Sequence, residues 1–169
     1  MAVRSLSLLA AAASALCLAG AAHGQAPSPI TQALTIKGPD GRTATVTDAQ
    51  LRDMHRFSVT AGFGEHHVYA GAPVSDLLAL VGGPSDVKLH GPPLDQIVIV
   101  TGSDGFIAVL SIAETARSFR DAPPTILADE VDGKPLDPKE GPYRLVIGGE
   151  LKASRSVRTV TTIELRPVH

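Results

Sequence analysis

Short runs of alternating hydrophobic and polar residues fill residues 33–165 and predict β-strands. Residues 33–37 and 43–46 flank Gly38-Pro39-Asp40-Gly41, a strong turn sequence, so they are predicted to form a hairpin. Residues 96–101 are apolar and rich in β-branched side chains, which is typical of a buried strand. Further strands are predicted over residues 57–60, 67–69, 106–110, 126–128, 143–147 and 156–165.

Three short helices are predicted between these strands. Thr47 is placed to cap a helix over residues 48–54, and Ser75 to cap a helix that ends at Gly82-Gly83-Pro84. A third short helix is predicted to begin at Ser111 or Ile112 and to end at Phe119. Short strands outnumber short helices, and the sequence has no regular strand–helix–strand alternation. The predicted fold class is therefore α+β, with a mixed β-sheet and short helices.

Residues 1–24 have the composition of an export signal. Arg4 supplies a positive charge, residues 6–19 are almost entirely apolar, and Ala21-Ala22-His23-Gly24 is rich in small residues. The apolar run is too short to cross a membrane. We therefore expect cleavage near the end of this segment and a periplasmic or secreted protein, without direct membrane insertion.

The rest of the chain divides into a lead-in over residues 25–32 and one domain over residues 33–169. Two alternatives to simple export are a retained membrane anchor and a lipid anchor on Cys17. Cys17 is the one cysteine of the 169 residues, so the exported part has no disulfide and no thiolate ligand. The formal net charge of −2 gives no reason to expect nucleic acid as a partner.

Candidate catalytic or metal-binding groups are sparse. His55, His66 and His67 lie near Glu65, but neighbours on a strand point to opposite faces, so His66 and His67 reach one metal ion only across a bend. A polar strand edge is the alternative explanation. No Gly-x-Ser-x-Gly sequence indicates a nucleophilic serine. Asp104 either caps its turn or binds a ligand, and both alternatives stay open.

Arginines and serines gather in the last third of the sequence. Arg144 lies on a predicted strand, and Arg155 and Arg158 flank the start of the last one, with Ser156 between them. Guanidinium groups beside hydroxyls favour a site for an anion or a polar ring. The alternative is a solvated strand edge whose charges prevent pairing with other chains.

Five segments resemble, in order, motifs of the sulfite-oxidase-like molybdopterin-binding domain family. They are Tyr69-Ala70-Gly71-Ala72-Pro73-Val74-Ser75-Asp76-Leu77-Leu78, Asp104-Gly105-Phe106, residues 127–136, Gly141-Pro142-Tyr143-Arg144-Leu145-Val146, and residues 156–165. Together they span nearly all of the predicted domain. The resemblance implies the sulfite-oxidase-like mixed β-sheet fold and a site for a pterin.

The resemblance also implies roles for individual residues. Arg144 takes the place of the arginine that contacts the pterin cofactor in the enzymes. Ser156, Val157 and Arg158 match the cofactor-holding stretch that opens the last strand, with arginine in place of lysine. Thr101 lies at the end of the buried central strand, where the family has a threonine.

A pterin is flat, with polar edges, and this chemistry suggests further contacts. Asp104 or Glu65 is expected at the amino edge, and one of the two matched arginines at the O4 edge. Phe106 or Tyr143 is expected to form a wall. Arg155, together with the arginine of the last strand, corresponds to the cationic end that holds phosphate in the enzymes.

The sequence departs from the family's pattern at the residue that ligates molybdenum. The cysteine that ligates molybdenum in the family corresponds to Val59 or Thr60, and neither side chain supplies a thiolate. We therefore expect a pterin, including a reduced pterin, as ligand, and no molybdenum.

A Cys-less, stand-alone domain resembles periplasmic regulators that bind reduced pterins and signal through a membrane-bound cyclic-di-GMP enzyme. The sequence thus favours an exported, non-catalytic pterin-binding protein that acts as a sensor or regulator. The alternatives are a molybdopterin-dependent oxidoreductase with an atypical site and a ligand-free interaction domain.

Overall fold

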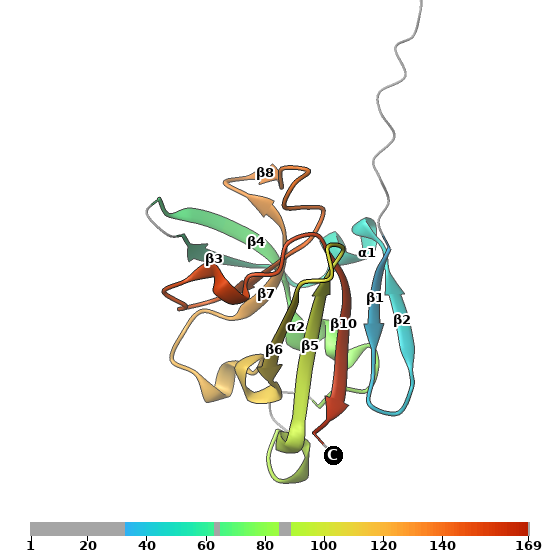
Figure 1. Ribbon diagram of the computed structural model, residues 1–169. Helices are drawn as coiled ribbons and strands as arrows, with labels where there is room; N and C mark the ends of the chain where they lie inside the picture. Colours follow the sequence, from blue (N-terminus) through green and yellow to red (C-terminus); the bar gives the residue numbers. More distant parts are fainter. Residues whose placement is uncertain (1–32, 63–64, 85–88, 169) are drawn as a thin grey trace, which may run out of the picture. The chain divides into compact units, whose positions relative to one another are not determined.

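The computed structural model describes residues 33–62, 65–84 and 89–168, and within them the strands form two five-stranded sheets (Figure 1). The first has the order β2-β1-β10-β5-β6, with β1 Leu34–Lys37, β2 Thr43–Val46, β5 Gln96–Gly102, β6 Ile107–Ser111 and β10 Val160–Pro167. The second has the order β3-β4-β7-β8, with β9 also paired to β7: β3 Phe57–Ala61, β4 His67–Pro73, β7 Thr125–Val131, β8 Lys134–Pro135 and β9 Arg144–Ile147. The predicted α+β class is confirmed.

The first sheet is mixed and the second is antiparallel. Strand β1 runs parallel to β10, whereas β10, β5 and β6 pair antiparallel, as do β1 and β2 in the predicted hairpin. All pairs of the second sheet are antiparallel. The strands predicted from sequence are therefore present, but they divide between two sheets.

The helices are short. They are α1 Asp48–Asp53, α2 Val74–Ala79 and the 3-10 turns η2 Pro92–Asp95, η3 Ile112–Glu114, η4 Arg117–Phe119 and η5 Ala153–Arg155. Thr47 caps α1 as predicted: its hydroxyl accepts from the Gln50 amide at 3.3 Å, and the Gln50 side chain accepts from the Thr47 amide at 3.0 Å. Among the described residues, no helix is long and apolar enough to cross a membrane.

Two helix predictions were wrong in detail. Ser75 does not cap α2, because the pairing of Pro73 with Ile126 keeps β4 extended to Pro73, which itself takes the cap position. Residues 112–119 form two 3-10 turns instead of one helix, and the Thr115 hydroxyl donates to the carbonyl of Ile112 at 2.7 Å where the first turn ends.

The last strand is also shorter than predicted. It begins at Val160 because Thr159 has a φ of 45°, which interrupts the extended backbone after η5. The predicted signal peptide, residues 1–24, and the lead-in, residues 25–32, lie outside the described residues.

The second sheet buries side chains on both of its faces. Leu145 and Ile147 of β9 belong to the main core, which also contains Ile163 of the first sheet. Val146, between them, belongs to a smaller core that includes Val59. Alternation along a strand produces this division, and it places Arg144 on the same face as Val146.

Glycine is required where β4 approaches β7. A Cβ atom at Gly71 would lie 2.0 Å from the carbonyl oxygen of Leu127, closer than any side chain tolerates. The glycine of the Tyr-x-Gly-x-Pro segment therefore permits the pairing of the two strands that lie beneath the site.

An ion-pair network fixes η5 against the first sheet. The Arg155 guanidinium lies 2.8 Å from Glu114 Oε1, donates to Glu150 Oε1 at 2.8 Å, and donates to the Val109 carbonyl at 3.3 Å. Glu114 also accepts from the Ser111 amide at 2.8 Å. Burial opposes ionisation of Glu114, but its hydrogen bonds to Arg155 and Ser111 outweigh burial and lower its pKa below the ordinary value of 4.5.

This lowered pKa predicts a stability that depends on pH. A carboxyl group with a depressed folded-state pKa stabilises the fold above about pH 4.5, and this contribution is lost as pH falls through the folded-state pKa. We expect Glu114→Gln to lower the free energy of unfolding by about 0.5–1 kcal/mol at neutral pH, since the pair is partly exposed. The difference from wild type should shrink at about pH 3.5.

Urea unfolding followed by circular dichroism at the two pH values measures this change. Glu164→Gln is the control, because the Glu164 carboxylate forms no hydrogen bond or ion pair with the described residues. A Glu114→Gln deficit that persists unchanged in acid would show that the pair contributes through packing and not through charge.

Candidate functional site

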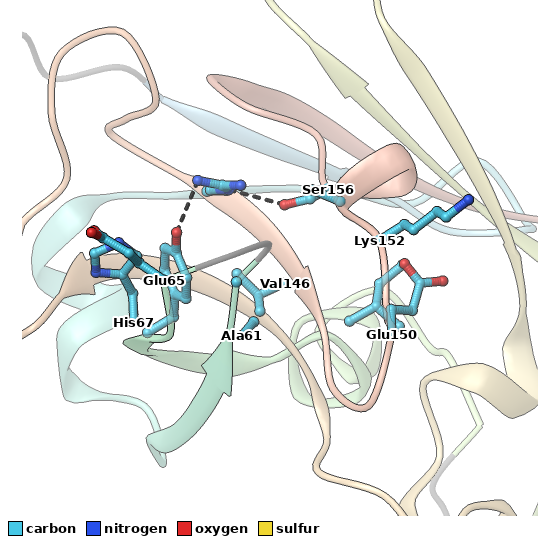
Figure 2. A pocket seen from close by; sticks show the side chains of 12 residues that line it. Ala61, Glu65, His67, Val146, Glu150, Lys152 and Ser156 are labelled. Atoms are coloured by element: carbon cyan, nitrogen blue, oxygen red, sulfur yellow. Dashed lines mark hydrogen bonds between the residues drawn. The ribbon is translucent and has the colours of Figure 1, made fainter.

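A pocket of about 410 Å³ lies over the outer face of the second sheet. Figure 2 shows Ala61 and Val146 between Glu65 and His67 on one side and Glu150 and Lys152 on the other. The described residues that line it are Ala61, Gly62, Glu65, His67, Tyr69, Arg144, Val146, Ile147, Glu150, Lys152, Ala153 and Ser156. Strands β3, β4 and β9 thus supply one wall, and the segment after β9 supplies the other.

Arg144 is the most constrained polar side chain of this pocket. It is 7% exposed, and its Nη1 donates to Tyr69 Oη at 3.0 Å and to Glu140 Oε2 at 2.6 Å. Its Nε donates to Ser156 Oγ at 2.9 Å, the bond that reaches Ser156 in Figure 2. The guanidinium carbon also lies 5.0 Å from the centre of the Tyr69 ring.

The second terminal nitrogen of Arg144, Nη2, differs from Nε and Nη1 in its hydrogen bonding. No described residue accepts a hydrogen bond from Nη2. Among the described residues, Nη2 is also not one of the fully buried side-chain atoms that lack a partner, so it keeps some contact with solvent, and Arg144 lines both hollows. A fixed guanidinium with free N–H groups is suited to donate to a ligand.

A second hollow of about 280 Å³ adjoins the first and shares Arg144, Ala153 and Ser156 with it. Arg158, Asp104 and Phe106 line it as well. Arg144 and Arg158 therefore line one hollow.

Glu140, which sequence analysis did not single out, joins these two arginines. Its Oε2 accepts from Arg144 Nη1 at 2.6 Å, and its Oε1 lies 3.4 Å from Arg158 Nε. The only sequence signal was a carboxylate four residues before Arg144. That spacing predicts contact on a helix but not in the loop that precedes β9.

Several predicted site residues do line the hollows. Ser156 and Glu65 line the first, and Asp104, Phe106 and Ser156 line the second. The Asp104 Oδ1 accepts from the Phe106 amide at 2.9 Å, so Asp104 caps its turn, while its part in binding stays a prediction. His67, Lys152 and Glu150 were not predicted as pocket residues, because no local pattern places them there.

Other predicted site residues lie elsewhere. Tyr143 does not form a pocket wall: it is 1% exposed in the main core, and its hydroxyl donates to Asp48 of α1. Burial, followed by this hydrogen bond, raises the pKa of Tyr143. Val157 is likewise a core residue, and Thr101 lines neither hollow. Arg155 is occupied by the network with Glu114 and Glu150 and lines neither hollow.

The described residues do not present an obvious metal site. They contain no group of three histidine, cysteine, aspartate or glutamate side chains that could hold an ion. His67 Nδ1 instead lies 2.7 Å from Asp132 Oδ2, and His66 precedes β4. Of the two residues at the family's cysteine position, Val59 is buried in the smaller core and Thr60 is exposed.

The comparisons with known proteins agree with this fold. The crystal structure of the sulfane dehydrogenase SoxCD from Paracoccus pantotrophus has a similar fold, with a TM-score of 0.62 and 19% sequence identity. The match covers 79% of this chain and 38% of that chain, so the present protein corresponds to well under half of it. A search of curated proteins gave no match. The model of the oxidoreductase molybdopterin binding domain family matches residues 40–168, most of the chain, and the protein therefore belongs to that family.

Proposed function

We propose that this protein is an exported, non-catalytic pterin-binding protein whose ligand ring occupies the first pocket. The supporting observation is the buried Arg144, which is fixed by Tyr69, Glu140 and Ser156, while no described residue accepts a hydrogen bond from its Nη2. The O4 and ring-nitrogen acceptors of a pterin suit such a donor. The guanidinium is already oriented, so little further ordering opposes binding.

The rest of the first pocket suits a flat ring with polar edges. Its volume of about 410 Å³ lies within the range usual for small-molecule sites. Ala61 and Val146 supply apolar surface, and Glu65 supplies an acceptor for the amino edge of a pterin. The residues present therefore fit the pterin ring of the family's cofactor.

The residues of the site do not supply the thiolate ligand that this family uses to hold molybdenum. Val59 pairs with Tyr69 across β3 and β4 and lies on the same face as Ala61, which lines the pocket. Of the two candidate cysteine positions, Val59 is thus directed toward the site, but its aliphatic side chain packs in the smaller core. A pocket with pterin-directed donors and no thiolate supports binding without redox chemistry.

The protein is also proposed to be exported and to act as a regulator. Export rests on the signal-like composition of residues 1–24. The regulatory role rests on the resemblance of this Cys-less domain to periplasmic pterin-binding regulators. By the same resemblance, the partner is a membrane-bound cyclic-di-GMP signalling protein.

Arg144→Ala should weaken the binding of a reduced pterin by about ten- to a hundred-fold, the usual effect of losing a charge-assisted contact of about 1.5–3 kcal/mol. Calorimetry under reducing conditions measures the affinity, and thermal unfolding confirms that the variant is folded. Arg42→Ala is the matched control, because Arg42 is largely exposed and pairs with Asp40 in the N-terminal hairpin. Wild-type affinity in Arg144→Ala would refute the site, and a wild type that binds no pterin would favour the interaction-domain alternative.

Protein produced with abundant molybdate should contain far less than one molybdenum per chain, since residues 18–169 contain no cysteine. Elemental analysis of the purified protein decides this. Stoichiometric molybdenum together with turnover of sulfite or a sulfoxide would instead establish the oxidoreductase alternative.

N-terminal sequencing of the exported protein should find a chain that begins between about residues 21 and 26, as the order of charged, apolar and small residues predicts. A chain in the periplasmic fraction that still begins at Met1 would contradict cleavage. Its absence from that fraction would contradict export.

A further inference from the structure

Glu140 holds the two arginines of the second hollow together. One carboxylate oxygen accepts from Arg144, and the other forms an ion pair with Arg158. The backbone also fixes Glu140, because its carbonyl accepts from the Thr159 amide at 2.9 Å. The Glu140 side chain is 27% exposed, so its charge is partly shielded from solvent.

The charges around the second hollow cancel. Arg144 and Arg158 are opposed by Glu140 and by Asp104, which lines the hollow itself. Arg155, the other cation expected to hold a phosphate, is paired with Glu114 and Glu150. The cationic end implied by the family resemblance is therefore neutralised in this chain.

We propose that Glu140 is a specificity-determining residue that makes the site select a pterin with an uncharged side chain and reject one that carries a phosphate. The inference rests on the proposed function, because it concerns the tail of the ligand whose ring lies in the adjoining pocket. A phosphate needs uncompensated cations and N–H donors. In this hollow it meets two arginines whose charges are balanced by two carboxylates, Glu140 and Asp104.

The test compares reduced neopterin with reduced neopterin monophosphate by calorimetry. Wild type should bind the uncharged form at least about ten-fold more tightly, and Glu140→Gln should reduce that preference about ten-fold or more by leaving one positive charge unbalanced. Glu130→Gln is the matched control: Glu130 also pairs with an arginine, Arg56 at 3.3 Å, but lines neither hollow. Equal affinity of wild type for the two forms would overturn the proposal, as would an unchanged preference in Glu140→Gln.

Arg158→Ala provides a test that does not depend on the folding of Glu140→Gln. Arg158 is 58% exposed, and its removal leaves Glu140 in excess, so the preference for the uncharged form should increase several-fold. The double variant Glu140→Gln/Arg158→Ala should return to the wild-type preference. An Arg158→Ala variant that discriminates less than wild type would contradict the charge balance.

Inorganic phosphate separates this inference from the proposed function. At matched ionic strength, phosphate should raise the unfolding temperature of Glu140→Gln but not of wild type or Glu130→Gln. If wild type binds neither neopterin, the proposed function fails, while a phosphate effect confined to Glu140→Gln still establishes the charge role of Glu140. The absence of that effect would refute the charge role, whatever the result with pterins.

Discussion

A positive charge that is almost removed from water determines how the site is built. Breaking a buried ion pair by removing one partner costs several kcal/mol, so a buried guanidinium requires hydrogen-bond and charge partners. Arg144 finds them in Tyr69 of β4, in Glu140 of the preceding loop and in Ser156 after η5. Three segments that are distant in sequence are thereby held at one point, and two hollows open beside it.

Local patterns predicted much of the fold and part of the site. Alternation identified the strand that carries Arg144, and the capping sequence identified the start of α1. The same alternation also shows why Tyr143 was a poor candidate for a pocket wall. Neighbours on an extended chain point to opposite sides, so if Arg144 faces the pocket, Tyr143 faces the core.

What the sequence did not predict depends on contacts between distant segments. The division into two sheets follows from pairing between β1 and β10, near opposite ends of the described chain, and no local pattern encodes it. The partners of Arg155 come from η3 and from the loop after β9, so its structural role becomes visible only after folding. Glu140 likewise acquires its importance from Arg158, which another loop brings close.

The complete burial of β9 bears on how the protein moves. All four residues of this strand are buried, and its central side chains serve both cores. Amide protons in such a strand exchange with solvent only when most of the domain opens, so this edge of the site does not loosen by itself. At β9, the proposed ligand would therefore meet a surface that is already formed, and little ordering of this strand would oppose its binding.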